Sequence, residues 1–228
     1  MSEKSSDQDL ISSENLKPLD TNLSFVLVHQ DFGNIVANTI KKWCIDCLRI
    51  TYPNSNIYDG DLTGPQHLFI GSRIQAYAQA RREIRGNLVF LDTDIVALCP
   101  IPDIWSETFD IGLTKGSIDS EYNLQPFNGG MIFAQDTVGA QFFFDYIENV
   151  CLNTMGGVFI NNWFVDQLAM GKAWDTQKAI INFKVFEKEY NYFPTQESDD
   201  GPAYFMHFKG DRKAFMHTFV NRVLNAST

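Results

Sequence analysis

The sequence predicts an α/β fold in which helices flank an open, mostly parallel sheet. Short apolar runs of strand length alternate with longer stretches whose apolar residues recur at helical spacing, a pattern typical of parallel α/β sheets. One run, residues 88–91 (LVFL), is apolar throughout, which favours a strand buried on both faces. A chain of 228 residues, 44% of them hydrophobic, can bury one full core. We therefore expect a single globular domain over residues 23–228.

Two strand–helix units are predicted in the first part of the chain. The apolar run at residues 24–29 has the length of a strand, and apolar positions at helical spacing follow between residues 35 and 48. A Pro-Asn turn then leads to a second candidate strand at residues 56–58. A second helix is expected at residues 72–85, because Gly86 is typical of the C-terminal end of a helix.

The rest of the chain continues this alternation. The third predicted strand is the run at residues 88–91. Further strands are predicted at residues 109–113, 130–133 and 205–208, and further helices at residues 138–152 and 163–170. Because such helices connect successive strands, most strands should run parallel in one sheet.

The chain is acidic, with a formal net charge of -10 at pH 7. A negative surface repels nucleic-acid phosphates and anionic lipid headgroups, so nucleic acid is not an expected partner. An acidic protein that binds a phosphorylated small molecule needs a local positive centre. That centre is either a basic pocket or a bound cation.

Residues 1–22 contain no aromatic residue and are rich in Ser, Asp, Glu and Lys, which predicts a flexible polar tail. No secretory signal and no apolar run of transmembrane length is seen, so we expect a cytoplasmic protein without a transmembrane segment. The four cysteines are too few and scattered for a disulfide framework. Cys44 and Cys47 fall inside the predicted first helix, which favours core packing over a redox or zinc site.

Two carboxylates, Asp92 and Asp94, directly follow the apolar run at residues 88–91. Ligands of open α/β sheets bind beyond the carboxyl ends of strands, and side chains two apart on an extended chain point the same way. Two such charges are costly without a cation between them, and carboxylates suit Mg²⁺ or Mn²⁺, which can bridge diphosphate oxygens. Asp-Thr-Asp can also be a polar strand end or a helix cap, so both interpretations stay open for the pair alone.

Further motifs accompany this pair along the chain. In order they are Asp31, Ser72-Arg73-Ile74, LVFLDTDIV at residues 88–96, FNGGMIF at residues 127–133, Asp166-Gln167 and HFKGDRK at residues 207–213. This order resembles the GT-A glycosyltransferases, and most closely the retaining family that includes glycogenin and the bacterial lipooligosaccharide galactosyltransferases. The resemblance spans about residues 24–215. It implies a single-domain GT-A fold and a nucleotide-sugar donor.

The resemblance also implies a metal site and a diphosphate site. The metal ligands would be Asp92, Asp94 and His207, with Mn²⁺ or Mg²⁺ as the cofactor, and Gly210 and Lys213 would contact the diphosphate. A neutral imidazole can ligate a metal, a glycine lets backbone N–H groups approach a phosphate, and an ammonium acts as a point charge. His207 alone would more often be a satisfied strand-end histidine, but the downstream glycine and lysine favour the ligand.

Seven residues form the donor-binding set that we expect, and two more are the catalytic candidates. The donor-binding set is Asp31, Arg73, Thr93, Asn128, Gly129, Gly210 and Lys213. The catalytic candidates are Asp166, expected to contact sugar hydroxyls, and Gln167, expected near the reacting face. Neither is assigned as a nucleophile.

Several of these residues have a second interpretation. Arg73 is either a solvated helix cation or a residue that holds the phosphate or the acidic cluster. Asp31 is either a loop carboxylate or a contact to the donor base. Asn128 and Gly129 are typical of a turn, and this is compatible with a contact between Asn128 and the sugar. Asp166 also suits a helix N-terminus through the helix dipole.

We therefore predict a metal-dependent glycosyltransferase that moves a hexose from a nucleoside diphosphate sugar to a hydroxyl acceptor. The acceptor would be a glycan, a protein or a small molecule. The resemblance implies a uridine-linked donor and retention of the anomeric configuration. The acceptor-binding region departs from the family, because Ala214 and Phe215 follow the last motif where Pro-Trp is frequent.

Two alternatives compete with this prediction. A nucleotide-sugar-binding module without turnover would keep the same fold. A sugar-phosphate nucleotidyltransferase would need a glycine-rich, basic loop after the first strand, whereas HQDFGN (residues 29–34) has one glycine and no Lys or Arg. The second alternative is therefore disfavoured by the sequence.

Overall fold

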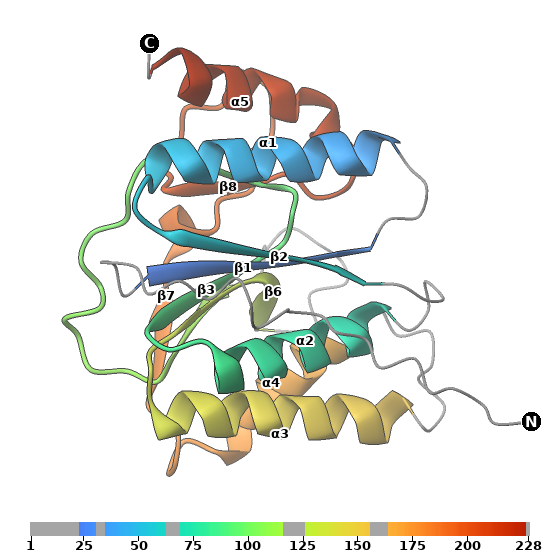
Figure 1. Ribbon diagram of the computed structural model, residues 1–228, viewed down its shortest axis with the longest axis vertical. Helices are drawn as coiled ribbons and strands as arrows, with labels where there is room; N and C mark the ends of the chain where they lie inside the picture. Colours follow the sequence, from blue (N-terminus) through green and yellow to red (C-terminus); the bar gives the residue numbers. More distant parts are fainter. Residues whose placement is uncertain (1–22, 31–34, 63–68, 116–125, 156–163, 227–228) are drawn as a thin grey trace, which may run out of the picture.

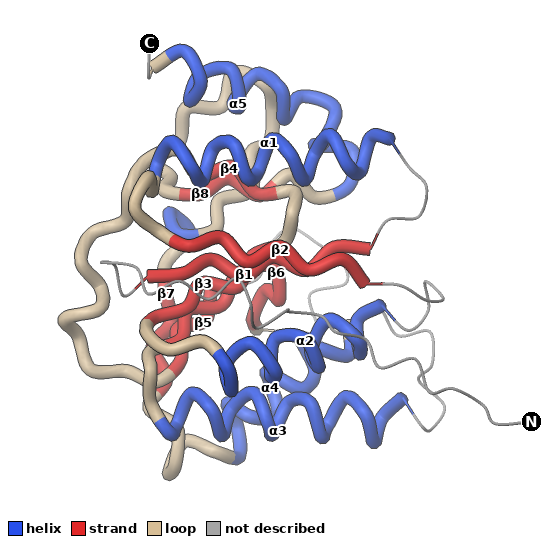
Figure 2. Tube along the Cα trace, in the orientation of Figure 1, coloured by secondary structure: helices blue, strands red, loops and turns tan. Residues whose placement is uncertain are grey.

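The computed structural model describes residues 23–30, 35–62, 69–115, 126–155 and 164–226. Residues 1–22, where a tail is predicted, and Asp31 lie outside this part of the chain. In the described part, a six-stranded sheet separates two layers of helices (Figure 1, Figure 2). The result is a three-layer α/β arrangement.

The central sheet is mostly parallel, as predicted. Its strands, in spatial order, are β2 (Asn56–Leu62), β1 (Leu23–Gln30), β3 (Asn87–Leu91), β6 (Phe127–Ala134), β5 (Ile111–Lys115) and β7 (Phe183–Phe186). Strand β1 is parallel to β2 and β3, and β5 is parallel to β7. Strand β6 is antiparallel to both of its neighbours, β3 and β5, so the other five strands run in one direction.

Helices cover both faces of this sheet (Figure 1). One face carries α2 (Phe69–Glu83), α3 (Val138–Met155) and α4 (Val165–Thr176), and the other lies toward α1 (Ile35–Thr51) and α5 (Met216–Asn225). Alternate residues of β3 pack to opposite sides: Phe90 contacts the α2–α4 side, whereas Val89 belongs to the cluster on the α1 side. This confirms that residues 88–91 form a strand buried on both faces.

A second, two-stranded sheet lies between the central sheet and α5. It pairs β4 (Ile95–Ala97) antiparallel with β8 (Phe205–His207). Ile95 and Phe205 pack toward the central sheet, whereas Val96 and Met206 pack against α1 and α5. Through this small sheet, β8 from the C-terminal part of the chain pairs with the segment that directly follows β3.

Two strands and one α-helix were not predicted from the sequence, namely β4, β7 and α5. Strand β4 has only three residues, and the residues of β7 are mostly half-buried, so both patterns are weak. Helix α5 does carry a helical pattern, since its buried residues are Met216, Phe219, Val220 and Val223. The predicted strand at residues 205–208 exists, but in the small sheet.

The C-x-x-C pair lies in α1, as predicted, and both thiols are buried in the hydrophobic core. Burial raises the pKa of Cys47 to about 12, which is typical of a packing residue and not of a reactive thiol. Among the helices that the structure describes, none is both long and apolar enough to cross a bilayer.

Candidate active site

Three residues carry the chain from the central sheet to the small one. Asp92 follows β3, and its backbone N–H donates to the Gly130 carbonyl at 2.8 Å. Asp94 precedes β4, and its carbonyl accepts a hydrogen bond from the Phe208 N–H at 2.8 Å. The residue after Asp94, Ile95, is paired with His207 in the small sheet. Backbone pairing thus brings His207 beside two aspartates that lie more than 100 positions earlier in the sequence.

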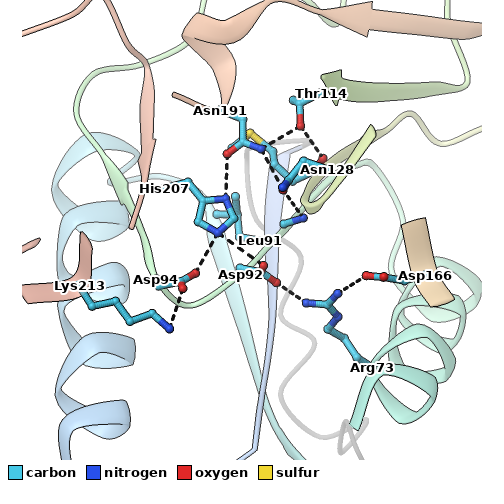
Figure 3. A network of polar contacts seen from close by, with 12 residues as sticks. Arg73, Leu91, Asp92, Asp94, Thr114, Asn128, Asp166, Asn191, His207 and Lys213 are labelled. Carbon is cyan, nitrogen blue, oxygen red and sulfur yellow. Dashed lines mark hydrogen bonds and ion pairs between the residues drawn. The ribbon is translucent and has the colours of Figure 1, made fainter. Parts of the chain in front are cut away.

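The three predicted metal ligands lie together. One potential ligand atom from each of Asp92, Asp94 and His207 falls within 4.8 Å of the others. His207 Nε2 is 3.2 Å from Asp94 Oδ1 and 3.7 Å from Asp92 Oδ2 (Figure 3). Asp92 follows β3 and residues 93–94 form a turn, so the convergence does not come, as the sequence suggested, from alternation along an extended strand. Two carboxylate oxygens and one imidazole nitrogen are a chemically suitable set for a divalent cation.

Arg73 is buried between Asp92 and Asp166 and forms an ion pair with each of them (Figure 3). Burial alone would lower the pKa of Arg73, but the two carboxylates raise it above its ordinary value. Of its two interpretations, the solvated surface cation is therefore wrong for this structure. Arg73 belongs to the acidic cluster.

Asp166, near the start of α4, has only 1% of its surface exposed. Burial raises the pKa of Asp166 because the charged form loses its hydration, and the guanidinium of Arg73, which is shared with Asp92, offsets only part of this. The Asp166 carboxylate lies in the space beside Gly129, where a Cβ would be 2.4 Å from Oδ2. Here a glycine gives room to a protein carboxylate.

Positive charge reaches the cluster from the C-terminal segment as well. Lys213 lies on the short helix η4 (Gly210–Phe215), and its Nζ is 2.9 Å from Asp94 Oδ2. Burial by itself would raise the pKa of Asp94, but His207, when its ring is protonated, and Lys213 together hold it below its usual range. Gly210 begins η4 with φ +63°, a conformation that favours glycine.

Two cavities meet at this cluster. The β1–α1 cavity, of about 280 Å³, is bounded by the end of β1, the start of α1 and Thr93. The β6–α4 cavity, of about 210 Å³, is bounded by Gly129, Gln167 and Gly210, among others. Four charged residues line both cavities: Arg73, Asp92, Asp94 and Lys213. A ligand with two different ends could therefore place its middle against these charges.

A polar group behind His207 was not predicted. Asn191 and Thr114 are almost fully buried and are joined by a hydrogen bond of 3.0 Å, and Asn191 Oδ1 lies 3.1 Å from His207 Nδ1. Asn128 belongs to this group because its Oδ1 accepts a hydrogen bond from Asn191. In the described part of the chain, Asn128 does not line either cavity. Nothing in the local pattern around residue 191 marks it as special. Only the fold reveals its position.

Neither a protein-family model nor a curated protein matches the sequence. Solved structures do match the fold. A glycosyltransferase involved in the glycosylation of the major capsid of PBCV-1 aligns with TM-score 0.63 and 16% identity, covering 86% of this chain and 98% of that chain. The glycosyltransferase GlyE of Streptococcus pneumoniae TIGR4, in its apo form, aligns with TM-score 0.58 and 12% identity, covering 89% of this chain and 62% of GlyE. The shared fold is that of glycosyltransferases, and the likeness does not single out the glycogenin family.

Proposed function

We propose that this protein is a metal-dependent glycosyltransferase with a catalytic domain at residues 23–228. It transfers a hexose from a nucleoside diphosphate sugar, uridine-linked, to a hydroxyl acceptor with retention of configuration. The observation that carries the proposal is that Asp92 and Asp94 line both cavities where they meet. A nucleotide sugar has a nucleoside at one end, a sugar at the other and a diphosphate between them, which matches this arrangement.

The cluster fits a divalent cation. His207 Nε2 is fully buried and makes no hydrogen bond within the described part of the chain, although it faces two carboxylates. Buried polar atoms in such a position are costly unless a proton or a metal ion compensates them. Asp92, Asp94 and His207 would hold Mn²⁺ or Mg²⁺. When bound, the cation would supply positive charge to the diphosphate of the donor and of the departing nucleotide.

The diphosphate would lie beside Lys213 and Gly210. The Lys213 side chain is 43% exposed and its ammonium is close to Asp94, so the ammonium can turn toward a phosphate oxygen without leaving the site. Gly210 has nothing within 4 Å of the position of a Cβ, so a phosphate can approach its backbone. Both residues would orient the leaving group, and Lys213 would also add positive charge near it.

The sugar would occupy the β6–α4 cavity. Asp166 has accepting capacity beyond its bonds to Arg73 and to the Gln167 N–H, so it can accept hydrogen bonds from sugar hydroxyls. Gln167 lines the same cavity and lies near the reacting face. Asn128 would support this side from behind the wall, because its Oδ1 accepts a hydrogen bond from the Gly130 N–H at 2.7 Å.

The nucleoside would occupy the β1–α1 cavity. Its wall combines Thr93 with the apolar residues Val36, Ala37, Ile40 and Phe69, which suits a flat base and a ribose. In this proposal Asp31, which directly follows β1 in the sequence and lies outside the described residues, contacts the donor. The acceptor would reach the sugar through the same β6–α4 cavity.

The proposal is tested by measuring hydrolysis of a panel of nucleotide sugars by the purified protein, with Mn²⁺ or with a chelator. We expect release of the nucleoside diphosphate from one donor, only with metal. Asp94→Asn should abolish this release because it removes one ligand charge at nearly unchanged volume. Asp175→Asn is the matched control, since it makes the same charge change on the exposed surface of α4.

Other outcomes would favour the alternatives. Metal-independent release, or full release by Asp94→Asn, would contradict the metal assignment. A donor that raises the melting temperature but is never cleaved, even with acceptor mixtures, would favour a nucleotide-sugar-binding module. Formation of a nucleotide sugar from a nucleoside triphosphate and a sugar phosphate would favour a nucleotidyltransferase.

A further inference from the structure

Asn191 connects the site to its support. It lies after the short helix η3 (Lys188–Tyr190) and is 2% exposed. Its Nδ2 donates to Thr114 Oγ1 at 3.0 Å and to Asn128 Oδ1 at 3.2 Å, and its Oδ1 faces His207 Nδ1 at 3.1 Å (Figure 3). All of these partners come from other elements. The amide is therefore clamped on both sides.

The direction of each hydrogen bond in this group follows from one unambiguous donor. The backbone N–H of Gly130 can only donate, so the atom of Asn128 that it contacts at 2.7 Å must be the amide oxygen. That oxygen also faces the amide of Asn191, so Asn191 must present its NH₂ group there. The remaining atom of the amide, Oδ1, can only accept. His207 must then carry a proton on Nδ1.

We propose that Asn191 is a positioning residue that fixes the tautomer and orientation of His207, so that a bare Nε2 lone pair is presented to a divalent cation held with Asp92 and Asp94. A neutral imidazole with its proton on Nδ1 has its lone pair on Nε2. Nε2 is the atom that lies 3.2 Å from Asp94 Oδ1. The inference rests on the metal site of the proposed function, and adds the residue that makes His207 a competent ligand.

The surroundings of the imidazole support a fixed orientation. Phe193 stacks on the ring, with 5.0 Å between centroids and 28° between planes. A Cβ on Gly130 would lie 2.4 Å from His207 Cε1, so little free space remains beside that carbon. The ring cannot move far, and Asn191 decides which of its nitrogens is protonated. Partners of this kind orient metal ligands in many proteins.

The first test compares Mn²⁺ affinity, measured by titration calorimetry or by the paramagnetic resonance of free Mn²⁺. Asn191→Leu keeps a similar volume but removes the acceptor for Nδ1–H. Loss of such a partner typically weakens metal binding by about 10- to 100-fold, and we expect this range here. Wild-type affinity in Asn191→Leu would overturn the inference while leaving the proposed function in place.

Two further variants separate the acceptor from general stability. Asn191→Asp keeps an oxygen toward Nδ1 but places its other oxygen against Asn128 Oδ1, so it should unfold more easily yet retain Mn²⁺ affinity close to that of the wild type. Thr114→Val removes a partner of Nδ2 and leaves the bond to Asn128 intact. It should also lose stability but not metal affinity. If metal affinity follows stability across all three variants, Asn191 acts only through folding and the inference is wrong.

A second measurement does not depend on the metal. Long-range ¹H–¹⁵N spectra of the imidazoles in the metal-free full chain report which nitrogen of His207 carries a proton. We expect a proton on Nδ1 of His207 in the wild type and its transfer to Nε2 in Asn191→Leu. A wild-type ring protonated only at Nε2, or an Nδ1 proton that persists in Asn191→Leu, would overturn the inference. Failure of the wild type to bind Mn²⁺, with the expected tautomers present, would instead refute the metal site.

Discussion

The guanidinium of Arg73 links Asp166 on α4 to Asp92 at the end of β3. The two carboxylates lie 93 and 19 positions from Arg73 in the sequence, and the Arg73 side chain is 7% exposed. Asp92 belongs to the proposed metal cluster and Asp166 to the proposed sugar side. The buried guanidinium of Arg73 therefore holds the proposed metal cluster and the proposed sugar side in fixed positions relative to each other.

Removal of the Arg73 guanidinium should destabilise the fold. Arg73→Met keeps the aliphatic volume but leaves two carboxylates close together, one of them almost fully buried. Breaking a buried ion pair from one side typically costs about 3–5 kcal/mol in the free energy of unfolding, and we expect a loss in this range. Urea denaturation at neutral pH measures it.

Arg82→Met on the same helix is the matched control. Arg82 pairs with Asp145 and Glu148 and is 44% exposed, so the expected loss is about 0–1 kcal/mol. Equal losses in the two variants would show that burial of the Arg73 pairs adds nothing to stability.

Gly130→Ala should damage the metal cluster directly. The new Cβ would lie 2.4 Å from His207 Cε1 and 2.8 Å from Asp92 Oδ2, so both groups would have to move. We expect Mn²⁺ affinity to fall by about 10-fold or more, as is typical when the orientation of metal ligands is disturbed. Calorimetric titration of the folded variant measures this.

Gly139→Ala provides the comparison. Its Cβ would meet the carboxylate of Asp110 at 2.2 Å, which is equally crowded but involves none of the cluster residues. This variant should lose stability and keep its Mn²⁺ affinity. A parallel loss of affinity in both variants would point to a general effect of overpacking.

Mn²⁺ should stabilise the folded protein. A ligand that binds only the native state at 100 times its dissociation constant adds about 2.7 kcal/mol to the free energy of unfolding, so the melting temperature should rise with Mn²⁺ and fall again with a chelator. Asp94→Asn should remove most of this rise. An unchanged rise in that variant would place the bound ion elsewhere.

Asp199 should make stability depend on pH in the acid range. Burial by itself raises the pKa of Asp199, but the N–H groups of Thr195 and Gly201 and the hydroxyl of Tyr192 donate to its carboxylate and lower the pKa overall. A lowered pKa in the folded state means that this contribution is complete above the unfolded value of about 3.9 and is lost as pH falls through the folded value.

Asp199→Asn measures this contribution. The variant should be less stable than the wild type at neutral pH, and the difference in free energy of unfolding should shrink as the pH falls below about 4. Asp175→Asn makes the same change of charge on the exposed surface of α4. A difference for Asp199→Asn that grows toward acid would contradict the assigned direction of the pKa shift.

Residues with a strong local signal were predicted well. The strand at residues 88–91 and the carboxylates after it follow from a continuous apolar run that ends in charge, and the structure contains both. Arg73 was ambiguous because a helix sequence does not tell whether an arginine faces solvent or a buried acid. Asn191 carried no signal at all, since an asparagine in a polar segment is most often a loop residue.

The sequence by itself determined the α/β class, the mostly parallel sheet and the position of the acidic pair at a strand end, because periodicity and apolar runs dictate which surfaces must be buried. Tertiary structure alone decided that β8 pairs with β4 and brings His207 to Asp94, that Arg73 lies between two carboxylates, and that Asn191 holds the imidazole. The physical reason is that hydrophobic burial is not directional and sets no partners between distant segments. Those partners depend on strand register and on hydrogen-bond geometry, which exist only once the chain is folded.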